Sequence, residues 1–173
     1  MHEYLANQLG ALALILNDRV EAAMGGRSAT AAAILASLRH HGPMTGTSLA
    51  RIVGVAQPTC VRVVDGLAAE GLVARGPKSG RDVQLQLTTQ GAAEAERLGR
   101  ARLAAIYPLL DDMTLGEGVT LGMMAAQLMA AATDSPQTAR RNCRLCEHSL
   151  CQGEACPIGV RADELEAAQS PPS

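Results

Sequence analysis

The chain of 173 residues is 47% hydrophobic and 18% charged, so it can form a core and is not globally disordered. It contains no Phe or Trp and only two Tyr, which excludes a protein that binds single-stranded nucleic acid by aromatic stacking. Its formal net charge is −2, so any binding of nucleic acid must come from a local basic patch rather than from the whole molecule.

Two features of the sequence bear on where the protein works. The start of the chain lacks a basic segment, and no cleavage site follows an apolar run, so we expect no signal peptide. The longest weakly polar stretch, 119–132, is shorter than the roughly 20 residues that a membrane helix needs. We therefore expect a cytoplasmic protein with no membrane contact, in which structural disulfides are rare.

The first part of the chain predicts four helices, because apolar residues recur at helical spacing and each run ends at glycine. Ser28 and Thr45 are the predicted N-caps of the second and third helices, and Pro58 is tolerated in the first turn of the fourth. The four helices are expected over 4–24, from 29 to about 41, over 46–53, and from about 57 to 70.

The period of the apolar residues then changes to two, which is typical of strands. Residues 72–75 and 83–87 predict two short strands. The loop between them, 76–82, contains two glycines, one proline and two cations. We therefore expect a β-hairpin with a solvated basic tip.

Two longer helices are expected after the hairpin. The first begins at an N-cap that is either Thr88 or Thr89 and extends to about residue 110. The second begins at a capping box of the Thr-x-x-Glu type at 114–117 and extends to about residue 132. Residues 133–142 then predict a linker, and 157–173 a mostly polar tail that is frayed after Leu165.

The order of the expected elements is that of a winged helix-turn-helix. In this arrangement the helix after the turn enters the major groove of DNA, and the hairpin tip reaches the backbone or the minor groove. Over residues 39–82, six Arg or Lys residues stand against three Asp or Glu, a local charge of +3. Such a patch is what phosphate binding requires, since neutralised phosphates and released counterions supply most of the affinity.

Four segments carry a family resemblance: VAQPTCVRVVDGL (55–67), EGLVAR (70–75), SGRD (79–82) and LQLT (85–88). They resemble the recognition helix and the wing of MarR-type transcriptional regulators. The resemblance spans about residues 5–132 and is most specific in 45–91. It implies a homodimer in which the first, fifth and sixth helices form the dimerisation region and two recognition helices read a pseudo-palindromic site. It also implies that a ligand or an oxidant often releases the DNA.

The resemblance also implies which residues meet DNA. By position these are Gln57, Pro58, Thr59 and Arg62 of the recognition helix and Arg81 of the wing tip. We add Lys78 as a phosphate partner on its charge alone.

The sequence also departs from the pattern of such regulators. Ala56 stands where a Ser-like cap is usual, Val61 where a small polar residue faces the groove, Gly66 where a basic residue is common, and Ser79 where Asp is frequent. Losing the cap alone costs about 1 kcal/mol.

Four of the five cysteines are crowded into one short polar segment with the spacing C-x2-C-x4-C-x4-C-P. They are Cys143, Cys146, Cys151 and Cys156. The C-x2-C pair lets two thiolates bind one ion or one edge of a cluster. Neighbouring arginines at 140, 141 and 144 would lower the pKa values of the thiols. The family resemblance does not extend to this segment.

Three interpretations of this segment remain open: a structural Zn²⁺ ion held by four thiolates, an iron–sulfur cluster, or a thiol–disulfide switch without a metal. His148 is a possible replacement for one of the zinc ligands. The fifth cysteine, Cys60, is expected to be a small buried side chain of the recognition helix.

The sequence thus predicts a mainly α (α+β) fold, a winged helix-turn-helix with long dimerisation helices at both ends. We expect a homodimeric repressor that binds double-stranded operator DNA and senses redox state or iron through its cysteines. We do not expect an enzyme, because no nucleophile motif and no phosphate loop is present. The predicted divisions are an N-terminal dimerisation helix, the winged helix, two dimerisation helices, and a linker with cysteine loop and tail: 1–27, 28–91, 92–132 and 133–173.

Two alternatives remain. One is a winged-helix protein with a purely structural zinc ion that responds to an unknown small-molecule ligand. The other is an interaction or electron-transfer protein that does not bind DNA.

Overall fold

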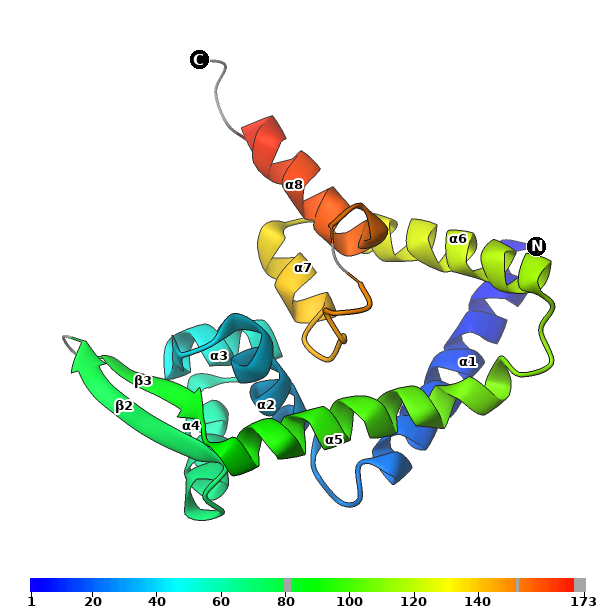
Figure 1. Cartoon of the computed structure of the whole chain (residues 1–173). Helices are drawn as coiled ribbons and strands as arrows, with labels where there is room; N and C mark the ends of the chain where they lie inside the picture. The colour runs from blue at the N-terminus through cyan, green and yellow to red at the C-terminus, as the bar shows by residue number, and fades with distance from the viewer. Residues whose placement is uncertain (80–81, 152, 170–173) are drawn as a thin grey trace.

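The computed structural model describes residues 1–79, 82–151 and 153–169. It shows a winged unit at one end, long helices that extend away from it, and a short C-terminal helical segment beside it (Figure 1). Within the described residues the fold is mainly helical with one small antiparallel sheet, so the predicted fold class is confirmed.

The winged unit contains the elements of the predicted helix-turn-helix and its hairpin. In chain order these are α2 (Ala29–His41), β1 (Met44–Thr45), α3 (Gly46–Val53), α4 (Gln57–Ala69), β2 (Val73–Ser79) and β3 (Asp82–Leu87). Among the described residues the sheet has the order β1-β3-β2, with Val73 opposite Leu87 and Met44 opposite Leu85. Strand β1 was not predicted, because two residues are too few to show an alternating pattern.

The N-caps predicted from the sequence are present. The hydroxyl oxygens of Ser28, Thr45 and Thr88 each accept a hydrogen bond from the backbone N–H three residues later, at 3.2, 3.2 and 3.0 Å. Helix α4 has no side-chain cap, because Ala56 stands at that position. Gly54 ends α3 in the left-handed conformation, with φ of +78°, which a residue with a Cβ rarely adopts.

The core of the winged unit lies between α2, α4 and the sheet. Cys60, Val64 and Leu67 bury one face of α4 against the apolar side of α2, where Ile34 and Leu35 are fully buried. This is the spacing of one face of a helix, so the sequence pattern predicts it.

The long helices and one short 3-10 helix lie outside the winged unit. They are α1 (His2–Ala23), α5 (Thr89–Ile106), the short 3-10 helix η1 (Tyr107–Leu109) and α6 (Leu115–Ala131). Helices α1 and α5 contact each other, and α6 contacts α8 (Figure 1). In the described chain, neither α1 nor α6 contains a buried residue. Both tyrosines belong to this part of the molecule and are exposed: Tyr4 by 70% and Tyr107 by 53%.

The C-terminal segment corrects the sequence prediction. Residues 133–142 were expected to form a linker, but they contain α7 (Pro136–Asn142), and the expected frayed tail contains α8 (Pro157–Gln169). Ser135 accepts a hydrogen bond from the backbone of Thr138 and is followed by Pro136, which is the chemistry of a helix start. A 3-10 helix, η2 (Gly153–Ala155), precedes α8.

No single helix in the described part of the chain has both the length and the hydropathy of a membrane span. Only α3 and α4 taken together, across a bend of 109°, have them.

Candidate functional site

The outer face of α4 carries the residues that were expected to meet DNA. Gln57, Pro58, Thr59 and Arg62 are all exposed, because Cys60, Val64 and Leu67 occupy the opposite face. The structure therefore brings the four predicted residues of α4 onto one solvent-facing surface. Their contact with DNA remains a prediction.

Two side chains on this surface differ in their chemistry. Arg62 forms no ion pair with any described residue, so its guanidinium is available to a phosphate or a base. Val61 is 46% exposed beside it and offers an apolar contact, such as one with a thymine methyl group.

Among the described residues, a charged contact joins the wing to the recognition helix. Arg75 on β2 pairs with Asp65 on α4, so its guanidinium joins the hairpin to the recognition helix. Lys78 belongs to β2, with its backbone opposite Val83. Arg81 lies outside the residues that the structure describes.

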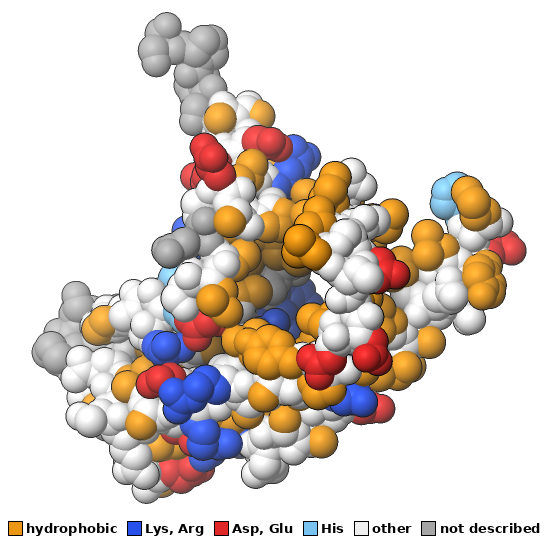
Figure 2. All heavy atoms as spheres, turned by 45° about the vertical axis from the view of Figure 1, so that its right-hand side comes forward, with side chains coloured by type: hydrophobic (Ala, Val, Ile, Leu, Met, Phe, Trp, Pro, Cys, Tyr) orange, Lys and Arg blue, Asp and Glu red, His pale blue; other side chains and the backbone are white. Residues whose placement is uncertain are grey.

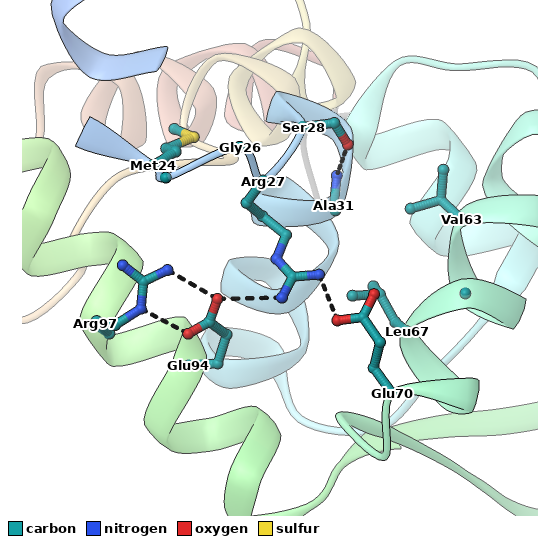
Figure 3. A pocket seen from close by; sticks show the side chains of 12 residues that line it. Met24, Gly26, Arg27, Ser28, Ala31, Val63, Leu67, Glu70, Glu94 and Arg97 are labelled. Atoms are coloured by element: carbon teal, nitrogen blue, oxygen red, sulfur yellow. Dashed lines mark hydrogen bonds and ion pairs between the residues drawn. The ribbon is translucent and has the colours of Figure 1, made fainter. Parts of the chain in front are cut away.

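A cluster of charged side chains that the sequence did not predict lies between α4 and α5 (Figure 3). The guanidinium of Arg27 donates to Glu70 at 2.7 Å and to Glu94 at 3.4 Å, and Arg97 also donates to Glu94. These side chains line a cavity of about 510 Å³ between the α1–α2 turn, α4 and α5. The hydrogen bond from Arg97 is the main reason that the pKa of Glu94 lies below its usual value. No local sequence signal links positions 27, 70 and 94.

The four clustered cysteines line a second cavity, of about 680 Å³, between the end of α2, α7 and the start of α8. All four are free thiols and half-buried. His40, His41 and His148 line the same cavity. Among the described residues, no three His, Cys, Asp or Glu side chains are arranged to hold a metal ion.

The cysteine segment is docked against the end of α2. Glu147 accepts a hydrogen bond from Arg39 at 2.7 Å, and the rings of His40 and His148 are stacked with centroids 4.1 Å apart. Leu145 packs against the core of the winged unit. The sequence did not predict these contacts, because they join positions far apart in the chain.

Helix α7 makes a further contact with the winged unit. It packs on α3, and Arg141 lies over the turn between α3 and α4. A Cβ atom added at Gly54 would come within 2.9 Å of the Nε atom of Arg141. The C-terminal segment therefore touches both helices that support the recognition helix.

A comparison with protein families finds a match in the winged unit. A model of the MarR family matches residues 28–80, which contain α2, α3, α4 and most of the hairpin. This winged-helix segment is therefore similar to the MarR family. A comparison with curated proteins gives no match.

Solved structures of other proteins resemble the chain beyond this segment. The YusO protein of Bacillus subtilis is 25% identical with a TM-score of 0.65, and the match covers 76% of this chain and 96% of YusO. Wild-type MarR of E. coli in its apo form is 25% identical with a TM-score of 0.58, over 69% of this chain and 96% of MarR.

A third similar structure contains DNA. It is a mutant MarR of E. coli complexed with operator DNA, 25% identical, with a TM-score of 0.55, over 70% of this chain and 93% of that chain. These three proteins are matched over nearly their whole length, whereas between about a quarter and nearly a third of this chain lies outside each match. The cysteine segment lies outside the residues that match the MarR family model.

Proposed function

We propose that this protein is a transcriptional regulator that binds double-stranded operator DNA through α4 and the wing. One observation carries the proposal: the exposed face of α4 presents Gln57, Thr59 and Arg62, which forms no ion pair with a described residue, beside a hairpin that is joined to α4. An α-helix of this kind fits the major groove, where arginine recognises guanine or a phosphate. The operator complex of the E. coli MarR mutant supports the same use of this fold.

The proposed regulator works as a homodimer on a pseudo-palindromic site. Large hydrophobic side chains of α1 and α6 are exposed in the single chain, including Leu12 at 42% and Met123 at 63%. Hydrophobic side chains are numerous on the side of the molecule that faces the viewer in Figure 2, where the α1 and α6 side of Figure 1 has come forward. A second copy would remove this surface from water, and its recognition helix would reach a half-site about one helical turn away.

We propose that the regulator is a repressor that acts in the cytoplasm, where its operator is. A dimer bound across a promoter occludes the promoter DNA sterically. This mode of repression requires no contact with another protein.

The test measures binding of the full chain to a fragment of its own promoter at several salt concentrations. We expect binding that weakens steeply with salt, as phosphate contacts require. Arg62→Ala is expected to lower the affinity about tenfold or more, since hydrogen bonds to charged groups contribute about 1.5–3 kcal/mol.

Arg100→Ala is the matched control. Arg100 is an exposed arginine on α5 that pairs only with Glu96 among the described side chains. Its removal changes the net charge equally without touching α4. Equal affinities of the two variants, or no binding of promoter DNA, would refute the proposed function.

We also propose that the regulator responds to redox state or to iron through its C-terminal cysteines. The support for this is that the segment carrying them rests on α2 and α3 of the winged unit. The other candidate site for a signal is the cavity around Arg27, but its cations and carboxylates already neutralise one another.

A further inference from the structure

The four cysteines of the C-terminal segment come from two places in the fold and meet at one cavity. Cys143 follows α7 directly and lies with Cys146 in a tight turn, in which the backbone N–H of Cys146 donates to the carbonyl oxygen of Cys143 at 2.9 Å. Cys151 and Cys156 flank η2 on the other side. The segment therefore presents two pairs of thiols to one cavity.

One of the four sulfur atoms already accepts a hydrogen bond from the protein backbone. The backbone N–H of Gly159, in the first turn of α8, donates to the Sγ atom of Cys156 at 3.2 Å. The thiolate is the form of cysteine that binds metals.

We propose that Cys143, Cys146, Cys151 and Cys156 are the four ligands of one metal centre, either a single Zn²⁺ ion or an iron–sulfur cluster. Both occupants are held by four thiolates and so have the same ligand chemistry. Since no three of these groups converge on a single point among the described residues, binding draws the two pairs together across the cavity. Every thiol that becomes a ligand loses its proton to solvent, so binding releases protons.

The metal centre also has a place in regulation, and this half of the inference rests on the proposed DNA-binding function. The turn that carries Cys146 also carries Leu145, Glu147 and His148, which contact the winged unit. Drawing the thiols together fixes this turn, and with it the contact of Glu147 with Arg39 on α2. Because α2 packs on both α3 and α4, a change in this contact alters the position of the recognition helix.

The first experiment measures metal in the full chain purified without oxygen. Zinc, iron and acid-labile sulfide are determined per chain, and the visible spectrum is recorded. We expect either one zinc in a colourless protein, or iron and sulfide in a brown protein that air bleaches. Four reactive thiols with neither metal, or two disulfides in their place, would overturn the proposal.

Cysteine variants locate the site. Cys146→Ala and Cys151→Ala, one from each pair, are expected to lose the metal. Cys60→Ala is the matched control, because Cys60 is fully buried in the winged unit and lies outside the cavity. Metal retained by the first two variants, or lost from the third at unchanged helix content, would place the site elsewhere.

A second measurement covers the case in which the variants do not fold. Wild-type protein stripped by a chelator is titrated with Co²⁺ in the absence of oxygen. Four thiolates around Co²⁺ produce intense absorption bands that saturate at one equivalent per chain. Absence of these bands from protein that retains its helices would also overturn the site.

The regulatory half is tested by the affinity for the promoter fragment with and without metal. We expect a change of at least fivefold on metal removal, the lower end of typical allosteric coupling, and a smaller change in Arg39→Gln. An unchanged affinity after metal loss refutes the coupling and leaves the metal site intact. No DNA binding in either state refutes the proposed function, while the metal content still reports on the site.

Discussion

The side chain of Arg27 joins the recognition helix of the winged unit to α5. It stands in the turn after α1 and donates to Glu70 at the end of α4 and to Glu94 on α5 (Figure 3). Its side chain is 22% exposed, so solvent screens these contacts less than those of a surface pair. The recognition helix is therefore tied to the long helix that leads to the dimerisation region.

We expect Arg27→Ala to lower the free energy of unfolding by about 1–2 kcal/mol, because two charged hydrogen bonds are lost. Urea denaturation followed by helix content measures this change. Arg100→Ala, which removes an exposed pair on one helix turn, should cost less than about 0.5 kcal/mol. Similar losses in the two variants would show that the network around Arg27 adds nothing beyond a surface contact.

Glu94 makes the stability of the winged unit sensitive to acid. Its pKa is lowered in the folded protein, chiefly by the hydrogen bond from Arg97. Below pH 4.5 the unfolded chain therefore binds a proton that the folded chain does not, and the free energy of unfolding falls until the folded pKa is passed. We expect Glu94→Gln to flatten this fall relative to the wild type, measured as the urea midpoint between pH 5 and pH 3. An unchanged slope would contradict the lowered pKa.

Ser37 is a residue at which the sequence is not optimal for stability. It is buried in α2, and its Oγ atom has no hydrogen-bond partner among the described residues. Ser37→Ala removes a buried polar group and installs the best helix former, so we expect a gain of about 1 kcal/mol in the free energy of unfolding. Ser28→Ala, at the N-cap of the same helix, should lower stability by about 1 kcal/mol. A destabilised Ser37→Ala protein would contradict this account of the Ser37 hydroxyl.

At the scale of elements, the start of α5 depends on a close approach to the backbone. A Cβ atom added at Gly91 would lie 1.9 Å from the carbonyl oxygen of Leu72, which also accepts the N–H of Thr88. Backbone cannot move aside as a flexible side chain can, so only glycine fits at this position.

We expect Gly91→Ala to lower the thermal stability of the winged unit by about 3 kcal/mol or more, although alanine is a better helix former than glycine. Gly99→Ala on the same helix is the control, since a Cβ there meets only the ends of two side chains. Calorimetry of both variants distinguishes steric conflict from helix propensity, because propensity alone would stabilise both.

The elements that the sequence predicts are those with local signals. Ser28, Thr45 and Thr88 mark helix starts through chemistry that acts within three residues, and the capping box of Thr114 and Glu117 is present as expected. Helix α7 was missed because its cap was read as part of a linker.

In the candidate sites too, the sequence predicts only the features that have a local signal. The exposed face of α4 follows from its helical period, and the cysteine spacing is visible in the sequence. The contact between Arg39 and Glu147 spans 108 positions, and neither residue is unusual where it stands. Contacts of this kind depend on how α7 folds back onto the winged unit, which no local pattern encodes.

At the scale of the whole molecule, large hydrophobic side chains of α1 and α6 are exposed to solvent in the single chain. We expect Leu12→Glu and Met123→Glu, on α1 and α6, to shift the protein from dimer to monomer in sedimentation experiments, because each places a charge on this surface. Val61→Glu, an equally exposed apolar position on α4, should leave the dimer intact and impair only DNA binding. Dissociation by all three changes would point to general unfolding rather than to an interface.

The placement of the two tyrosines has a consequence for spectroscopy. Tyr4 and Tyr107 belong to the long helices, and residues 28–91 contain no tyrosine or tryptophan. The ultraviolet emission of the protein therefore arises entirely from the end of the molecule remote from α4. Association of two chains changes that emission directly, whereas an event in the winged unit reaches it only through α5. The tyrosine emission of unlabelled protein therefore reports directly on the expected dimer surface. It does not report directly on the surface that is expected to bind DNA.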